Sequence, residues 1–118
     1  MNRIEIAVMR PQVALDAFAE TWRQAETGEQ ITPRLAFGSL RELFSAITEK
    51  RLELVRYVAA HEGLNVRQLA QGLGRDYENV YIDVKELVEL GLLERSEQGH
   101  LTVPFDEIII RAEIRDAA

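Results

Sequence analysis

NVRQLAQGLGRDYENVYIDVKELVELGLLERSEQGHLTV, which runs from Asn65 to Val103, is the stretch that decides the fold. Asn65 is a favourable N-cap for a first short helix, and Gly72 and Gly74 interrupt the chain after it. Asp76 is the N-cap candidate for a second helix. The apolar positions of that helix recur at the spacing of one amphipathic face: Val80, Val84, Leu87 and Val88.

Two short strands are predicted after the second helix. Gly91 stands where a C′ glycine commonly ends a helix. Leu92–Leu93 and Leu101–Val103 then flank a glycine turn, and Pro104 ends the second strand. A helix, a turn, a second helix and a hairpin form the winged helix–turn–helix arrangement. The sequence therefore predicts an α+β fold with a winged helix–turn–helix domain over residues 39–104.

Residues 1–38 are predicted to form a strand–helix–strand extension. Arg3–Met9 alternates apolar and polar residues, as a half-buried strand does. Gln30–Phe37 is interpreted as a second strand, which Pro33 confines to a sheet edge. Between the strands, residues 12–25 place four residues on one helical face: Leu15, Phe18, Trp22 and Ala25.

Two further helices and a C-terminal segment complete the chain. Ser39 opens one helix with a capping box, and Thr48 caps the next. Residues 105–118 form the tail, in which Phe105–Ile114 has an ambiguous period. Its isoleucines favour a strand, which could extend the sheet begun by Arg3–Met9.

The apolar face of the N-terminal helix predicts a homodimer. A winged domain does not need residues 1–38, and an apolar appendage in a short chain commonly packs against a second copy. Leu15, Phe18 and Trp22 would then lie in the dimer interface. The alternative is that these side chains cover the back of their own domain.

Composition excludes several classes of protein. The chain of 118 residues has no cysteine, which excludes disulfides and thiolate metal sites and fits a cytoplasmic protein. It has no secretory signal and no apolar run of the ~20 residues needed to span a bilayer, so no membrane partner is expected. No H-x-x-x-H motif, no Gly-rich phosphate loop and no G-x-S-x-G motif occurs, so we expect neither an enzyme nor a cofactor. Asp106, Glu107 and Asp116 are better explained as a solvated acidic turn than as a metal site.

The segment LAQGLGRDYENVYIDVKELVELGLLERSEQGHLTVPFDEI, from Leu69 to Ile108, resembles MarR-type winged-helix regulators. Its DYENVYIDVKELVELGLLE run and the G-x-L-x-V-P-F-D-E-I tail resemble one subgroup of small prokaryotic MarR-like proteins. Some members of that subgroup are encoded beside a toxin, as antitoxins. The resemblance implies the fold and a role in binding double-stranded DNA. It names no operator and no ligand.

In such a fold the second helix is the recognition helix, whose N-terminal residues contact base edges. Asparagine can pair with adenine and tyrosine hydroxyls can reach phosphates. We therefore expect base or backbone contacts from Tyr77, Asn79 and Tyr81, and phosphate contacts from Arg75 and Lys85. The alternative for each tyrosine is packing against a neighbouring helix.

Basic and polar residues outside the recognition helix give weaker indications. Arg95, Gln98 and His100 are the hydrogen-bond donors near the tip of the hairpin, which is either a DNA contact or a solvated turn. Lys50, Arg51 and Arg56 alternate with acidic residues, a pattern typical of a solvated helix face. The alternative is a contact of Lys50 or Arg51 with the DNA backbone.

The acidic charge leaves two functions open. The net charge is −6, and Asn65–Val103 holds seven acidic against four basic residues, so a monomer should bind DNA weakly. The sequence favours a dimeric transcription regulator, a repressor of its own promoter and an antitoxin candidate. The alternative is a protein-binding module that neutralises a basic partner toxin without specific DNA binding.

Overall fold

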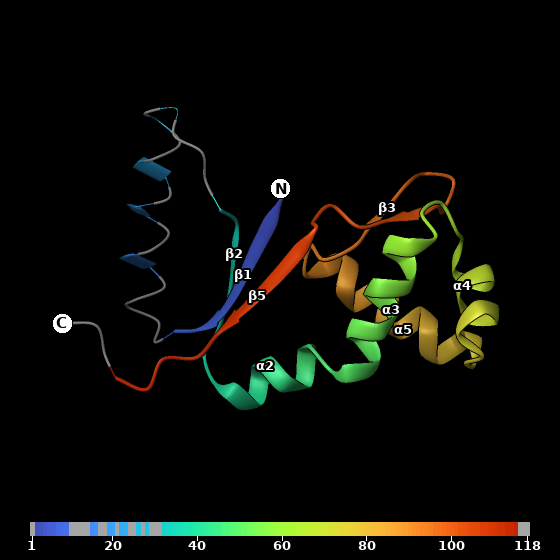
Figure 1. The fold of residues 1–118 in the computed structure, drawn as a ribbon, viewed down its shortest axis with the longest axis horizontal. Coiled ribbons are helices and arrows are strands. Elements are labelled where there is room, and N and C mark those ends of the chain that lie inside the picture. The colour runs from blue at the N-terminus through green and yellow to red at the C-terminus, as the bar shows by residue number, and fades with distance from the viewer. Residues whose placement is uncertain are drawn as a thin grey trace. The chain divides into compact units, whose positions relative to one another are not determined.

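The computed structural model describes residues 2–9 and 32–115, together with residues 15, 16, 19, 20, 22, 23, 26 and 28. The chain divides into two compact units. The terminal unit comprises Met1–Ser45 and Asp106–Ala118, and the central unit comprises Ala46–Phe105. The described residues form four helices, a three-stranded sheet and a two-stranded sheet (Figure 1). The predicted α+β class is confirmed.

The sheet of the terminal unit is parallel and has the order β2-β1-β5. The central strand β1 (Arg3–Val8) pairs with β2 (Arg34–Phe37) on one side and with β5 (Glu107–Arg111) on the other (Figure 1). Ile4 and Ile6 are buried on one face of β1, and Glu5 and Ala7 are buried on the other. Burial of both faces is typical of a parallel strand.

The strand predictions are confirmed at both ends of the chain. The C-terminal isoleucines form a strand, and that strand extends the sheet begun by β1, in the register Ile4–Ile108 and Ile6–Ile110. The strand predicted over Gln30–Phe37 begins at Arg34, directly after Pro33, and lies at a sheet edge as expected. The carbonyl oxygen of Pro33 still accepts a hydrogen bond of 3.0 Å from the Glu5 amide.

Helix α2 (Leu40–Ala46) starts at the predicted cap. The Ser39 hydroxyl accepts a hydrogen bond from the Glu42 amide at 3.1 Å, but the Glu42 carboxylate accepts from Gly38 rather than from Ser39. The reciprocal half of the capping box is thus displaced by one residue. Leu43 is buried, whereas Leu40 and Phe44 are exposed.

Three capped helices form most of the central unit: α3 (Glu49–Ala60), α4 (Val66–Leu73) and α5 (Tyr77–Glu89). Thr48, Asn65 and Asp76 cap them as predicted, and Asn65 forms a complete capping box with Gln68. Each cap satisfies backbone amides that the first helical turn leaves without partners. None of the helices among the described residues is both long and apolar enough to cross a bilayer.

The two-stranded sheet is shorter than predicted. Strands β3 (Glu94–Arg95) and β4 (Leu101–Thr102) are antiparallel and have two residues each. Leu92 and Leu93, predicted to lie in the first strand, precede it and are buried in the core. Leucines at a helix end contribute more by filling the core than by extending an exposed hairpin.

Gly72 does not interrupt the chain as predicted, because it lies inside α4. A methyl group at Gly72 would collide with the Tyr57 hydroxyl, so its lack of a side chain makes room for that ring. Gly74, by contrast, ends α4 in the left-handed conformation, with φ of 65°.

The units differ in extent from the predicted domains 1–38, 39–104 and 105–118. The boundaries lie after Ser45 and after Phe105, so the terminal unit includes most of α2. The tail is not a separate part: β5 belongs to the sheet of the N-terminal strands, and the Asp106 amide donates to the Asn2 carbonyl at 2.7 Å.

Candidate functional site

Helix α5 has a buried face and an exposed face, as predicted. Val80, Val84 and Leu87 are each at most 1% exposed. These contacts fix the rotation of the helix and leave its other side to solvent. The exposed residues of that side include most of the predicted site: Tyr77, Glu78, Asn79, Tyr81, Ile82 and Lys85.

The two tyrosines of α5 contact each other and remain half open to solvent. Their ring centroids are 6.2 Å apart, and the side chains are 44% and 40% exposed for Tyr77 and Tyr81. The Arg67 guanidinium of α4 lies 5.7 Å from the centroid of the Tyr77 ring. Tyr77 thus contacts α4 through Arg67, and both tyrosines stay partly exposed to solvent.

Arg75 lies in a different setting from the freely exposed phosphate ligand that the sequence suggested. Its Nη2 atom is 2.7 Å from Asp83 Oδ2, and the side chain is 22% exposed. Its Nη1 atom is buried and has no hydrogen-bond partner among the described residues. Most of the charge of Arg75 is therefore directed into the protein.

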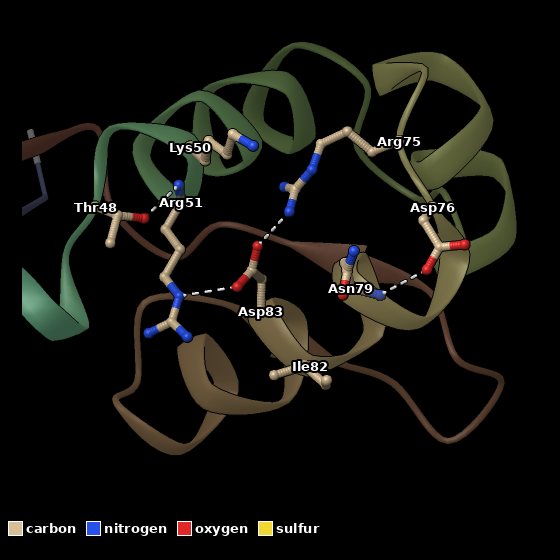
Figure 2. Close-up of a pocket in the computed structure, with 8 residues that line it drawn as sticks. All are labelled: Thr48, Lys50, Arg51, Arg75, Asp76, Asn79, Ile82 and Asp83. Carbon is tan, nitrogen blue, oxygen red and sulfur yellow. Dashed lines mark hydrogen bonds and ion pairs between the residues drawn. The ribbon is translucent and has the colours of Figure 1, made fainter.

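Asp83 binds a second arginine, which comes from α3. Arg51 Nε lies 3.0 Å from Asp83 Oδ1, Arg51 Nη2 lies 2.6 Å from a Glu86 oxygen, and Arg51 Nη1 donates to the Ala46 carbonyl at 2.9 Å. Figure 2 shows Arg51 and Arg75 approaching the Asp83 carboxylate from opposite sides. The prediction of a solvated helix face is wrong for Arg51, which is 9% exposed.

The pKa of the Arg51 guanidinium reflects two opposing effects. Burial lowers this pKa, and the hydrogen bonds and charges of Asp83 and Glu86 raise it by more, so it lies above its ordinary value. Arg51 therefore remains cationic. We call Arg51, Asp83, Arg75 and Glu86 the ion cluster, and it connects α3, α5 and the turn before α5.

Three members of the ion cluster, Arg51, Arg75 and Asp83, line an open hollow of about 420 Å³ together with Thr48. Lys50 and Asn79 lie at its sides, and Asp76 and Ile82 complete the lining on the α5 side (Figure 2). A second hollow of about 420 Å³ lies at the turn between α4 and α5 and is lined partly by Arg67, Arg75 and Tyr77. The exposed face of α5 is thus bordered by recesses that contain cationic side chains.

The tip of the hairpin is a tight turn with polar side chains outside. Ser96 closes it, because its hydroxyl accepts from the His100 amide at 3.0 Å and its own amide donates to the His100 carbonyl at 2.9 Å. The predicted donors Arg95, Gln98 and His100 are all exposed. The geometry is compatible with either interpretation, a nucleic-acid contact or a solvated turn.

The predicted dimer residues are only partly described. Leu15 and Trp22 are 65% and 62% exposed, and Trp22 Nε1 donates to Glu26 Oε1 at 3.0 Å. Phe18 lies outside the described residues. Both described side chains are mostly exposed, and their participation in a dimer remains a prediction.

No group of three or more potential metal ligands occurs among the residues that the structure describes. Asp106 caps the amide of Asn2 at 3.0 Å, and Glu107 lies 3.3 Å from Arg3 Nε. Asp116, the third acid of the improbable metal site, lies outside the described residues.

Asp83, Arg51 and Arg67 belong to this site although the sequence did not predict them there. Asp83 and Arg51 are 32 positions apart, so their ion pair depends on how α3 packs on α5. One signal was present: Asp83 directly precedes Val84 of the buried face, where a carboxylate requires a partner. The contact of Arg67 with Tyr77 could not be predicted from the sequence, because it depends on the angle at which α4 and α5 pack.

One protein-family model, described as HVO_A0114, matches residues 46–110. The match covers the whole central unit and continues into β5. No curated protein and no solved structure matches the sequence.

Proposed function

The chain belongs to the HVO_A0114 family, and we propose that it is a sequence-specific DNA-binding regulator of transcription. In this proposal the central unit is a winged helix–turn–helix domain of the MarR-like kind, and α5 lies in the major groove. The protein acts as a homodimer that represses its own promoter. The observation that carries the proposal is the exposed face of α5, where Tyr77, Asn79, Tyr81 and Lys85 are accessible on a helix held by a buried opposite face.

Each residue of that face has a distinct role in the proposal. The major groove, about 12 Å wide, admits one α-helix. Asn79, in the first turn of α5, pairs with the edge of an adenine. The hydroxyls of Tyr77 and Tyr81 and the ammonium group of Lys85 contact the phosphate backbone, which fixes the helix in the groove without specifying sequence.

The ion cluster positions α5 for this contact. Arg51 and Arg75 attach Asp83 to α3 and to the turn before α5. The Arg75 guanidinium is committed to Asp83 through Nη2, and its Nη1 is buried, so little of its charge is offered to a phosphate. We therefore propose that Arg75 positions α5 rather than contacting DNA. Arg67, which is exposed beside Tyr77, is proposed as the additional contact with the DNA backbone on that side.

The hairpin would contact the DNA beside the recognition helix. Arg95, Gln98 and His100 are exposed donors at its tip and are proposed to approach the adjacent minor groove or backbone. Because the net charge is −6, phosphate attraction is weak for a single copy. Two copies double the contacts, so the proposal requires a dimer and double-stranded DNA as the two partners.

Binding titrations on a DNA fragment from upstream of the protein's own gene test the proposal. Lys85→Ala should weaken binding to all sequences about equally and reduce the salt dependence by roughly one phosphate contact. Asn79→Ala should cost roughly 1–3 kcal/mol at one base position and leave the other positions unchanged. Arg41→Ala, which removes an exposed charge from α2, is the matched control and should change neither.

A second function is favoured by the charge. The chain is acidic, and the exposed side of α5 carries Glu78 beside the apolar Ile82, which is 52% exposed. A basic protein, such as a partner toxin, would find charge complementarity there. If a verified dimer fails to bind its upstream DNA at low salt, and both α5 substitutions are silent, this protein-binding function replaces the first.

A further inference from the structure

The outer edge of β5 is the longer of the two edges of the terminal sheet. β5 has five residues, β2 has four, and no other strand among the described residues pairs with the outer side of β5. An edge strand presents unpaired amide and carbonyl groups, which can pair with another strand. β2 is a poorer template because Pro33, which has no amide hydrogen, directly precedes it.

The side chains of β5 are arranged symmetrically about Ile109. Glu107, Ile109 and Arg111 share one face of the sheet, and Ile108 and Ile110 share the other. Glu107 and Arg111 are thus equidistant from Ile109 and carry opposite charges. The strand is complementary to itself in the antiparallel direction.

We propose that two copies of the chain pair antiparallel through β5, with the two-fold axis at Ile109. Glu107 of each copy then lies opposite the partner's Arg111, and Ile109 lies opposite the partner's Ile109. The two three-stranded sheets become one continuous sheet. Either the odd-numbered or the even-numbered residues of β5 direct their backbone amide and carbonyl groups away from β1. In both cases an axis at Ile109 places position 107 opposite position 111, so the proposed register is the same.

Neighbouring registers lack this complementarity. With the axis at Ile110, Glu107 would lie opposite the partner's Glu113, and like charges directly opposite are destabilising. With the axis at Ile108, Glu107 would lie opposite the partner's Ile109 and Arg111 would lie opposite the partner's Phe105. The charges therefore select one register and favour a second copy of this chain over a uniformly basic partner.

Ion pairs within the chain extend the pattern to a row of four charges. Arg3 Nε lies 3.3 Å from Glu107 Oε1, and Arg111 Nη1 lies 3.7 Å from Glu5 Oε1. Across the proposed interface the signs alternate from Arg3 to Glu107, to the partner's Arg111 and to the partner's Glu5. Glu5 is 7% exposed, so its carboxylate gains from a second nearby row of opposite charge.

This inference rests on the proposed function in one respect: the proposed function requires a dimer, and the pairing of β5 supplies one. None of the α5 residues is involved, so the pairing of β5 can be measured without DNA. Failure of one proposal therefore leaves the other measurable on its own.

Charge reversal tests the register. Glu107→Arg places arginine opposite arginine in its own dimer, and Arg111→Glu places glutamate opposite glutamate. Each variant alone should dimerise roughly tenfold more weakly or worse, because two cross-strand pairs turn from attractive to repulsive. An equimolar mixture of the two should restore the dimer, because every cross-strand pair is then of opposite sign.

Sedimentation velocity gives the readout, with a dimer at twice the chain mass of 13.4 kDa. Glu113→Arg is the matched control, since it makes the same charge change in the terminal unit outside β5 and should leave the dimer intact. Circular dichroism verifies that each variant is folded. A monomeric wild type, or a dimer that survives both single reversals, overturns the proposal. So does a mixture that stays monomeric.

Cross-linking provides a second measurement that does not depend on charge. The chain has no cysteine, so Ile109→Cys introduces a single thiol at the proposed axis. Under mild oxidation it should form a disulfide-linked dimer, because directly opposite Cβ atoms lie about 4.5–5.5 Å apart. Ile114→Cys, at a residue 97% exposed and outside the strand, is the collision control. Equal rates for the two variants would contradict the pairing at Ile109.

Discussion

The central and terminal units of this chain obtain their stability in different ways. The central unit is one continuous segment, and each of its helices is capped by the residue that precedes it. The terminal unit joins two separate segments, Met1–Ser45 and Asp106–Ala118, and the paired strands β1 and β5 are more than 100 positions apart in the sequence. Local signals therefore determine much of the first unit and little of the second.

The two units also differ in how their large exposed apolar side chains are distributed. In the central unit the large exposed hydrophobic side chains all belong to α5: Tyr77, Tyr81 and Ile82. Among the described residues of the terminal unit they are distributed over several elements: Leu15, Trp22, Leu40, Phe44, Ile110 and Ile114. In the proposed function this single apolar and aromatic face is the binding surface of the central unit. The scattered set does not mark one surface, and the proposed pairing of two copies through β5 would involve only Ile110 of these residues.

The largest expected effect is a loss of stability of the central unit when the ion cluster loses its shared carboxylate. Asp83→Asn leaves two arginines, 11% and 22% exposed in their side chains, without their common counter-charge. Removal of one partner from a largely buried ion pair should lower the free energy of unfolding by about 3 kcal/mol. Chemical denaturation followed by circular dichroism measures the change.

Glu86→Gln is the control for this substitution. Glu86 also binds Arg51, but its side chain is 50% exposed, so its loss should cost less than about 1 kcal/mol. Hydrogen exchange of the β1 amides gives a second comparison. If Asp83→Asn increases exchange in β1 as much as in α5, the two units unfold together and the contrast between them is wrong.

A smaller effect is expected at the contact between α3 and α4. Gly72→Ala adds a methyl group where the Tyr57 hydroxyl lies, and the Tyr57 ring is stacked on His61 with centroids 4.2 Å apart. Overpacking should cost roughly 1–3 kcal/mol, partly offset by the better helix propensity of alanine, roughly 1 kcal/mol. The net loss of stability, about 1 kcal/mol, is measurable by denaturant titration.

The double variant Tyr57→Ala, Gly72→Ala decides whether the collision is the cause. With the ring removed, the added methyl group has space, so Gly72→Ala should become neutral or stabilising in that background. An equal cost in both backgrounds would mean that glycine is needed at this position for a reason other than the approach of Tyr57.

The parts of the fold that could be predicted follow this local and non-local division. Asn65, Asp76 and Gly91 act through hydrogen bonds and backbone angles within a few residues, so their positions in sequence were sufficient to place the helix ends. The strand of C-terminal isoleucines was predicted from composition alone. Its place in the sheet of β1 was also predicted, but the parallel direction and the register Ile4–Ile108 were not, because they relate residues more than 100 positions apart for which the sequence carries no short-range signal.

The candidate site follows the same rule. The exposed face of α5 could be predicted because helical periodicity separates it from Val80, Val84 and Leu87. The roles of Arg51 and Arg75 could not, because a charged residue in a sequence of alternating charges looks the same whether it faces solvent or Asp83. Only the packing of α3 against α5 distinguishes the two cases.

The smallest expected effect concerns Arg3 and separates the stability of one chain from that of the dimer. The ion pair of Arg3 with Glu107 is 3.3 Å long, and both side chains are about half exposed, at 53% and 48%. Such a pair contributes ~0–1 kcal/mol because water and side-chain entropy offset its attraction. Arg3→Ala should therefore leave the unfolding midpoint of a dilute, monomeric sample almost unchanged.

In the proposed row of four charges Arg3 is the outermost cation, so its removal should weaken dimerisation by a factor of about two to three, and more at low salt than at high salt. Sedimentation equilibrium at two salt concentrations measures the dimerisation constant, and denaturant titration of a dilute sample measures the unfolding midpoint. A large loss of monomer stability would mean that Arg3 supports the sheet itself. A dimerisation constant that is unchanged at low salt would remove Arg3 from the row of charges.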